Sequence, residues 1–245
     1  MSKLQSVAGI TYNKLFYATH PTRTYDKRLQ TLKDAYKGQR CFLIGSGPSI
    51  EKMDLSLIEN EITVGLNMLY KTGIKTDFYF VIGYRIMRYI EELLKLENLF
   101  LGGSAGRWYL KHLSTVKPLI KQHNYTEPYV LKEYGEIGVW DDISLDITKG
   151  LRGGSGVSFV ALQTMLYLGF KEVYLLGHDC DYRAQGQYFY DKSDIGYERD
   201  WEQIFNNYKI VKKYYERQGS KIYNATVGGK LDVFKRKSLK EIAWN

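Results

Sequence analysis

The chain has 245 residues, of which 44% are hydrophobic and 25% charged, and its formal net charge is +8. This length suits one α/β domain with an ample core, and no apolar run approaches the roughly 18 residues that a membrane span needs. The polar start lacks the apolar region of a signal peptide, and two cysteines are too few for a disulfide framework or a zinc site. We therefore expect a cytoplasmic protein.

The positive charge indicates an anionic partner, which is a nucleotide, a nucleic acid or an acidic membrane surface. Nucleic acid is the weakest of these, because the basic residues are scattered and no RNA-binding aromatic motif or helix-turn-helix pattern is present. The lysine-rich segment 209–240 could rest against anionic lipid headgroups, although a solvated helix face explains these lysines more simply.

Residues 1–38 are polar, and we interpret them as an N-terminal extension with one helix. Apolar runs then predict strands at 40–44, 62–67, 78–83 and 99–101. Between the last two strands, apolar residues repeat at helical spacing, at Ile86, Ile90, Leu93 and Leu94. This alternation predicts an α/β fold with a mostly parallel sheet covered by helices.

The middle of the chain, about 104–150, is less regular and contains Pro118 and Pro128. We expect an inserted subdomain or a flexible lid there, within a single domain over 39–245. Regular alternation returns afterwards, with a helix predicted at 157–168, a strand at 172–177, a helix at 199–218 and a strand at 221–224.

The first strand runs directly into a turn of small residues, Gly45-Ser46-Gly47-Pro48-Ser49. Its two glycines leave the backbone N–H groups open to an anion, the proline favours a helical turn, and Ser49 adds a hydroxyl donor. Ile50 replaces the third glycine of a Rossmann fingerprint, and no Walker A Lys-Ser/Thr pair follows. The turn is either a tight connection or a phosphate cradle. In the second case, we expect Gly47→Val to abolish nucleotide binding and leave the fold intact.

A second anion site is predicted where Gly154-Ser155-Gly156 opens the helix at 157–168, because helix starts offer N–H donors. Arg152 can add positive charge, although Ser155 is also an ordinary helix cap. Asn67 follows the second strand, and its amide bonds either a base or ribose, or only the local turn. Ligands of open α/β sheets bind at the carboxyl ends of strands, so we expect nucleotide phosphates between the 45–49 turn and this helix start.

The densest polar segment, 178–182, follows the strand at 172–177. Asp179 and Asp181 form a D-x-D pair, which in many sugar-transfer enzymes holds a divalent metal against a nucleotide diphosphate. In extended chain the two carboxylates point to opposite sides, so one shared metal requires a turn here. His178 with Cys180 is too sparse for zinc. The pair therefore leaves a catalytic metal open, and we assign no metal ligand.

Tyr182 and Tyr188 flank a polar stretch that we interpret as a surface loop. Phenol hydroxyls can donate hydrogen bonds to a leaving phosphate without adding positive charge. In a chain with 22 tyrosines, packing is the competing explanation.

Together these motifs resemble two groups of proteins. The resemblance is carried by the 45–49 turn, Asn67, Arg152, Ser155-Gly156-Val157, and the run from Leu168 to Leu175 with Gly177. These motifs resemble those of the bacterial CMP-sialic-acid-dependent sialyltransferases of the Campylobacter lipooligosaccharide type. They resemble more closely the DUF115 family of polysaccharide-cluster proteins, which includes archaeal pterin pyrophosphokinase-like members and whose pattern the segment 221–231 also fits. The similarity spans about 38–234.

The resemblance implies a GT-A-like or Rossmann-like, metal-independent, inverting glycosyltransferase. It places CMP on the 45–49 turn, Asn67 and the 154–156 turn, with Arg152 and Asp179 in the same binding set. Tyr182 and Tyr188 match in spacing two tyrosines that assist departure of the CMP phosphate.

One departure concerns the general base, which in the sialyltransferases is a histidine just before the last helix. The histidines of this chain lie elsewhere, at His20, His112, His123 and His178. A carboxylate can accept the acceptor's proton instead, and we take Asp200 as the candidate among Asp191, Asp194, Glu198, Asp200 and Glu202.

The leading hypothesis is a transferase of surface-polysaccharide or lipooligosaccharide assembly. It would move an acidic sugar from a CMP donor to a glycan or lipid-linked acceptor, need no cofactor, and contact the inner face of an anionic membrane. The alternatives are an ATP-dependent pyrophosphokinase on a pterin-like alcohol, which needs Mg²⁺ or Mn²⁺, and a non-catalytic nucleotide-binding or glycan-binding module. Self-association into a homo-oligomer stays open.

Overall fold

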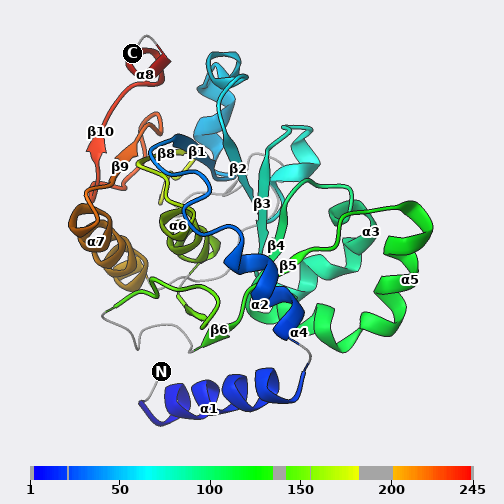
Figure 1. Ribbon diagram of the computed structural model, residues 1–245. Helices are drawn as coiled ribbons and strands as arrows, with labels where there is room; N and C mark the ends of the chain where they lie inside the picture. Colours follow the sequence, from blue (N-terminus) through cyan, green and yellow to red (C-terminus); the bar gives the residue numbers. More distant parts are fainter. Residues whose placement is uncertain (1–2, 21, 135–141, 155, 182–200, 244–245) are drawn as a thin grey trace.

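The computed structural model describes residues 3–20, 22–134, 142–154, 156–181 and 201–243 (Figure 1). Its centre is an eight-stranded sheet in which every strand pair is parallel. In spatial order the strands are β10 (Lys235–Arg236), β9 (Lys221–Asn224), β8 (Glu172–Leu176), β1 (Arg40–Ile44), β2 (Thr63–Leu66), β3 (Phe78–Val81), β4 (Leu99–Leu101) and β5 (Tyr129–Val130). The predicted α/β fold with a mostly parallel sheet is confirmed.

The strand order reverses at β1. From β1 the chain moves outward through β2, β3, β4 and β5 on one side, and it then returns to pair β8 with the other side of β1. Ile44 and Leu176, the last residues of β1 and β8, are partners in the register. The carboxyl ends of these two strands therefore form the topological switch point, where open α/β sheets bind ligands.

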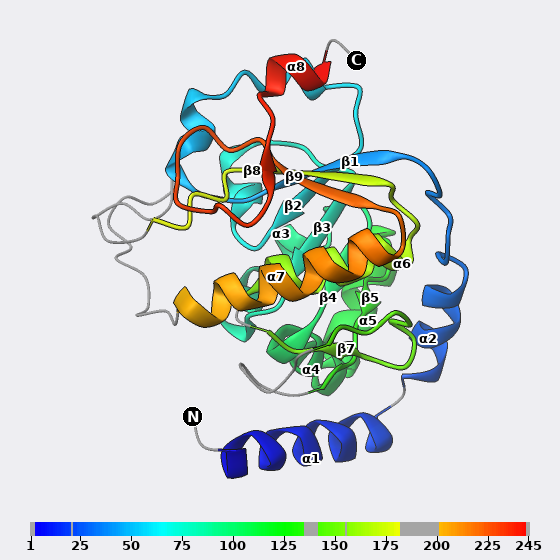
Figure 2. The same cartoon turned by 90° about the vertical axis from the view of Figure 1, so that its left-hand side faces the viewer.

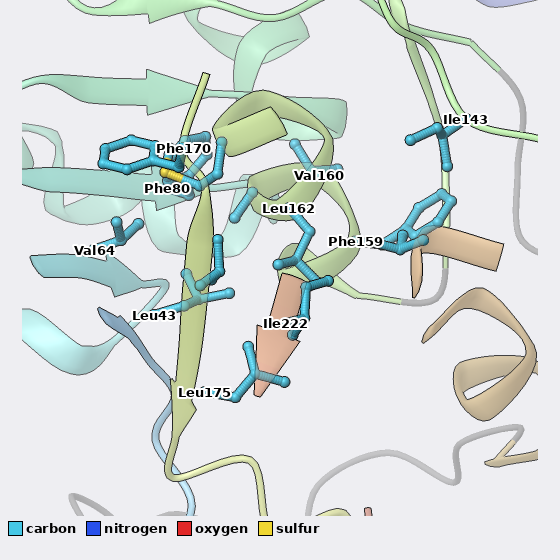
Figure 3. Close-up of a cluster of buried hydrophobic side chains, with 14 of the residues drawn as sticks. Leu43, Val64, Phe80, Ile143, Phe159, Val160, Leu162, Phe170, Leu175 and Ile222 are labelled. Atoms are coloured by element: carbon cyan, nitrogen blue, oxygen red, sulfur yellow. The ribbon is translucent and has the colours of Figure 1, made fainter. Parts of the chain in front are cut away.

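Both faces of the sheet are buried. Successive residues of a strand point to opposite faces, and both sets of side chains are buried in β1. In β1, Cys41 and Leu43 belong to one hydrophobic cluster, and Phe42 and Ile44 belong to a second. The first cluster lies under α6 (Val157–Tyr167) and α7 (Trp201–Arg217), which cross one face of the sheet (Figure 2). In Figure 3, side chains of β1, β8 and α6 meet in this cluster.

The second face is covered by α4 (Gly103–Lys111), α5 (Leu113–His123), α8 (Leu239–Ala243) and short helical turns. These turns are η1 (Pro48–Lys52), η2 (Leu55–Ile58), η3 (Leu69–Thr72) and η4 (Tyr84–Tyr89). The helix expected around 86–94 is thus a 3₁₀ turn followed by one α-helical turn, α3 (Ile90–Leu93).

The N-terminal extension differs from the expectation of one helix. It contains α1 (Lys3–Thr19) and α2 (Arg23–Gln30). Phe16 and Tyr17 of α1, and Tyr25 of α2, are buried in the second cluster, so the extension packs onto the domain.

The described part of the segment 104–150 contributes helices and strands to the domain. It supplies most of α4, all of α5, and the edge strand β5, which pairs with β4. It also supplies β6 (Glu133–Tyr134), which forms a small parallel sheet with β7 (Leu151–Arg152). Beyond residues 135–141, which are outside the description, Ile143 and Ile147 are buried in the first cluster. None of the described helices is both long and apolar enough to cross a membrane.

Candidate functional site at the switch point

Three elements converge at the switch point: the 45–49 turn after β1, the segment 177–181 after β8, and the start of α6. Contacts between residues far apart in sequence hold them together. Ser49 bonds Asp179, and Ser158 of α6 bonds His178. We call this arrangement the β1–β8 corner.

The 45–49 turn uses three of its backbone N–H donors inside the protein. The N–H of Gly45 donates to the carbonyl of Leu176 at 2.8 Å, and the N–H of Gly47 donates to the carbonyl of Gly177 at 3.0 Å. The N–H of Ser49 donates to Asp179 Oδ1 at 3.2 Å. Three N–H groups that the sequence predicted to be open to a phosphate are therefore already bonded, and the turn is first of all a tight connection.

The close approach of the two loops explains why Gly47 is a glycine. A Cβ atom there would lie 1.9 Å from Asp179 Oδ2 and 2.6 Å from the carbonyl oxygen of Gly177. The expectation that Gly47→Val leaves the fold intact is wrong, because a side chain at this position collides with the β8 loop.

Asp179 is buried against the first turn. Its Oδ2 accepts the Ser49 hydroxyl at 2.8 Å, while its Oδ1 accepts the Ser49 N–H. Burial raises the pKa of the Asp179 carboxyl above its ordinary value, and the two hydrogen bonds from Ser49 oppose that rise. The carbonyl of Asp179 accepts the N–H of Lys230 at 2.7 Å. Asp179 therefore ties the turn after β1 to the loop between β9 and β10.

Asp181 points elsewhere. Its Oδ1 lies 2.8 Å from Lys230 Nζ, and its side chain is 44% exposed. Cys180, between the two acids, has a φ of 47°, so the chain does turn here. The turn separates the D-x-D carboxylates, since one faces Ser49 and the other faces Lys230. Among the described residues, no group of three or more His, Cys, Asp and Glu side chains could hold a metal.

From the sequence, His178 is considered only as a zinc ligand, but the structure places it at the centre of a buried hydrogen-bond network. Its Nδ1 lies 3.0 Å from the carbonyl oxygen of Leu176, and its Nε2 lies 3.2 Å from Ser158 Oγ. The backbone N–H of His178 donates to Thr226 Oγ1 at 3.0 Å. Burial lowers the pKa of His178 to about 4, so the ring is neutral at pH 7. No sequence motif marks Ser158, which follows the expected Gly-Ser-Gly start by two residues.

The start of α6 has two unlike glycines. A Cβ at Gly154 would lie 2.2 Å from the ring of Phe159, so that position is filled. Gly156, the N-cap, has extended backbone with φ 172°, and no described atom lies within 4 Å of its ideal Cβ. The first N–H groups of any helix lack partners within the helix. The start of α6 at Gly156 therefore has both open space and N–H groups without partners in the helix. Ser155 lies outside the described residues.

Arg152 lies on β7 and pairs with Asp142. Its Nε lies 2.9 Å from Asp142 Oδ1 and its NH2 lies 3.0 Å from Asp142 Oδ2. The side chain of Gln163 accepts the Arg152 N–H and donates to its carbonyl, which fixes β7 to α6. The predicted positive charge near the helix start is thus partly neutralised by a bidentate carboxylate.

Asn67 follows β2 with a φ of 48°, a left-handed conformation that suits asparagine. Its N–H donates to the carbonyl of Phe80 at 2.8 Å. Its Oδ1 accepts only a long contact, 3.5 Å, from the N–H of Ile82. The local-turn role is therefore present, and the side chain stays partly exposed at the ligand-binding edge.

A further acid of this edge carried no sequence signal. Glu133 of β6 is buried, and its Oε2 has no hydrogen-bond partner among the described residues. Burial raises the pKa of Glu133 to about 7, although Arg107 and the N–H of Gly103 lower it. This side chain lies beside the glycines that follow β4, Gly102 and Gly103.

Tyr182, Tyr188 and Asp200, the expected catalytic residues, lie outside the described residues, as do Asp191, Asp194 and Glu198. Glu202 lies in the first turn of α7.

A family model described as 6-hydroxymethylpterin diphosphokinase MptE-like matches residues 16–185. This is more than half of the chain, and it includes β1, α6, β8 and both acids of the D-x-D pair. No curated protein matches the chain. The chain therefore belongs to the MptE-like family, the DUF115-type family that its motifs predicted.

Proposed function

We propose that this protein is a transferase that moves a diphosphate group from ATP to the hydroxyl of a pterin-like alcohol, with the β1–β8 corner as its active site. The supporting observation is that a switch-point corner with an open helix start lies inside the segment matched by the diphosphokinase family model. Family membership moves this reading ahead of the CMP-sugar reading that the motifs alone favoured.

The reaction joins the alcohol oxygen to the β-phosphorus of ATP and breaks the bond between that phosphorus and the bridging oxygen to the α-phosphate. AMP leaves with the bonding electron pair, and the proton of the alcohol passes to water. Such transfers depend on positioning and on stabilising phosphate charge. The start of α6 at Gly156 supplies N–H donors and the positive end of the helix dipole for one phosphate.

The reaction calls for Mg²⁺, which usually enters such sites on the nucleotide phosphates. The two acids that the sequence offered as its ligands face Ser49 and Lys230 instead of each other. The described residues therefore do not fit a preformed Mg²⁺ site, and we assign no metal ligand.

This divergence of Asp179 and Asp181 favours a second candidate, metal-independent transfer of an acidic sugar from a CMP donor to a glycan hydroxyl. That reading also depends on Tyr182, Tyr188 and Asp200, which the structure does not describe. The two candidates share a nucleotide-phosphate donor and an alcohol acceptor, so both use the same corner.

The first experiment is a thermal-shift panel of ATP, CMP, CDP, UDP and GDP with and without Mg²⁺, because a ligand at 100 times its Kd adds about 2.7 kcal/mol of stability. We expect stabilisation by ATP. ATP and 6-hydroxymethylpterin, incubated with the protein, should then give AMP and the pterin diphosphate by mass spectrometry. Stabilisation by CMP alone, with EDTA harmless, would replace this reading with sugar transfer.

Two variants at Gly156 test the location. Gly156→Ala fills open space without charge, and Gly156→Asp adds an anion at the same place. We expect ATP to bind the Asp variant at least about tenfold more weakly than the Ala variant, because like charges repel at the helix start. Equal ATP affinities of two folded variants would remove this helix start from the site.

A further inference from the structure

The Ser158–His178 pair has a fixed direction of hydrogen bonding. The carbonyl of Leu176 can only accept, so the Nδ1 of His178, 3.0 Å away, carries the proton of the neutral ring. The Nε2 is then a bare acceptor. Ser158 Oγ, 3.2 Å from Nε2, must donate its hydroxyl proton to the ring.

This direction decides what Ser158 can offer to a ligand. Once the hydroxyl proton points at His178, the remaining lone pairs of Ser158 Oγ can only accept hydrogen bonds. Ser158 is the second residue of α6 and is half-buried, so its oxygen lies at the rim of the corner. A phosphate, which needs donors, would meet lone pairs there, whereas a group that carries a proton would be bound.

We propose that Ser158 accepts the hydrogen bond of the acceptor's reacting hydroxyl, and that His178 is the positioning residue that makes Ser158 an acceptor. The ligand class is therefore an alcohol, held one residue away from the N–H donors at Gly156 and Val157 that suit the phosphate of the donor. This assignment rests on the proposed function, in which the acceptor is a pterin-like alcohol.

The surroundings of His178 preserve this arrangement. A Cβ at Gly45 would lie 3.3 Å from His178 Cε1, so the ring packs against the turn after β1. α6 carries no charged side chain. The two acids that follow His178 are bonded to other partners, Asp179 to Ser49 and Asp181 to Lys230. Burial keeps the pKa of His178 low, which maintains the bare Nε2.

The first test needs no ligand. The chain has four histidines, so ¹⁵N-labelled histidine gives a spectrum that can be assigned with His178→Gln or by elimination with the other three. We expect His178 to be neutral with the proton on Nδ1 across pH 6–8. A proton on Nε2 would make Ser158 Oγ a donor toward the site and would overturn the proposal.

The second test uses two ligands that differ by one hydroxyl, 6-hydroxymethylpterin and 6-methylpterin. We expect the wild-type protein to bind the hydroxymethyl compound about fivefold more tightly, the usual worth of one hydrogen bond. Ser158→Ala should bring the two affinities together, and Ser158→Thr, which keeps a hydroxyl, should restore the preference. Ser238→Ala, which removes an exposed hydroxyl bonded to Glu241, is the matched control.

The outcomes separate this inference from the proposed function. A preference for the hydroxymethyl compound that persists in folded Ser158→Ala overturns the role of Ser158 alone. Binding of neither pterin by a protein that binds ATP overturns the pterin substrate and this assignment together. ATP affinity should be the same in Ser158→Ala and the wild type, since the serine faces the acceptor. A loss of ATP affinity of tenfold or more would place Ser158 on the phosphate side and contradict the proposal.

Discussion

Two buried carboxylates at the ligand-binding edge of the sheet have opposite surroundings. Asp179, 8% exposed, has both oxygens bonded by the N–H and hydroxyl of Ser49. Glu133, 9% exposed, keeps one oxygen without a partner among the described residues. The first acid holds two loops together. The second carries a desolvation penalty that raises its pKa to about 7.

The surroundings of Asp179 predict a rigid scaffold, and those of Glu133 predict a response to pH. Around Asp179, the N–H groups of Gly45, Gly47 and Ser49 and the Ser49 hydroxyl are bonded within the protein, so this side of the corner is a scaffold. Glu133 has a pKa of about 7, so its carboxyl group gains or loses its proton near neutral pH. The start of α6 offers further N–H donors at the corner. The following variants test this contrast.

The largest effect is expected from Gly47→Ala. Its Cβ would collide with Asp179 Oδ2 and the Gly177 carbonyl, so the free energy of unfolding should fall by about 3 kcal/mol. Gly156→Ala, in open space with extended backbone, should change it by no more than about 0.5 kcal/mol. Urea unfolding of both variants measures the difference. Equal stabilities would mean that the two loops are not in contact as described.

The second effect concerns pH and Glu133. Its folded pKa is raised from 4.5 to about 7, so between these values the folded state binds more protons than the unfolded state and stability falls as pH rises. Glu133→Gln removes this loss. At pH 8 the variant should be more stable than the wild type by up to about 3 kcal/mol, and at pH 4 the two should be similar.

His178 changes the stability of the folded state with pH in the opposite direction to Glu133. Its folded pKa is lowered from 6.5 to about 4, so between these values the unfolded state binds more protons and stability rises with pH. The two residues therefore offset each other between about pH 4.5 and 6.5 in the wild type. Glu133→Gln should reveal the rise that His178 causes. A stability curve of Glu133→Gln parallel to that of the wild type would show that Glu133 is not buried as a carboxylate.

Sequence reasoning predicted the main strands well for a physical reason. Strands buried on both faces are apolar throughout, as in Phe42, Leu43 and Ile44, and such runs stand out without any alignment. β5 was missed because its two residues are too short for a pattern. The irregular pattern of 104–150, with Pro118 and Pro128, predicts an inserted subdomain or a flexible lid, because a proline such as Pro118 of α5 obscures helical character.

The candidate site could be predicted from the sequence only where its residues are contiguous in the chain. The glycine turn and the start of α6 are contiguous motifs, and both lie at the corner. The partner of Ser49 is 130 residues away, and nothing near Ser49 shows that its donors are occupied. Glu133 and Ser158 have no motif of their own, because burial and a hydrogen bond to His178 distinguish them only after folding.

The smallest effects come from the D-x-D acids, and they sharpen the contrast within the corner. Asp179→Asn keeps the shape but weakens the bonds to Ser49, so stability should fall by about 1 kcal/mol. Asp181→Asn breaks only an ion pair whose side chains are 49% and 44% exposed, which is worth less than about 0.5 kcal/mol. Thermal unfolding at pH 7 measures both.

The same two variants decide how the acids take part in turnover. If Asp179 and Asp181 act as described, Asp181→Asn should keep nearly full kcat with ATP and Mg²⁺, because its carboxylate is paired with Lys230 at the exposed rim. Asp179→Asn should lower kcat through the loosened turn, and ATP affinity should fall with it. An equal, hundredfold or larger loss in both variants, with retained stability, would mean that the acids converge on a metal during the reaction. The separation of the two carboxylates would then belong only to the ligand-free corner.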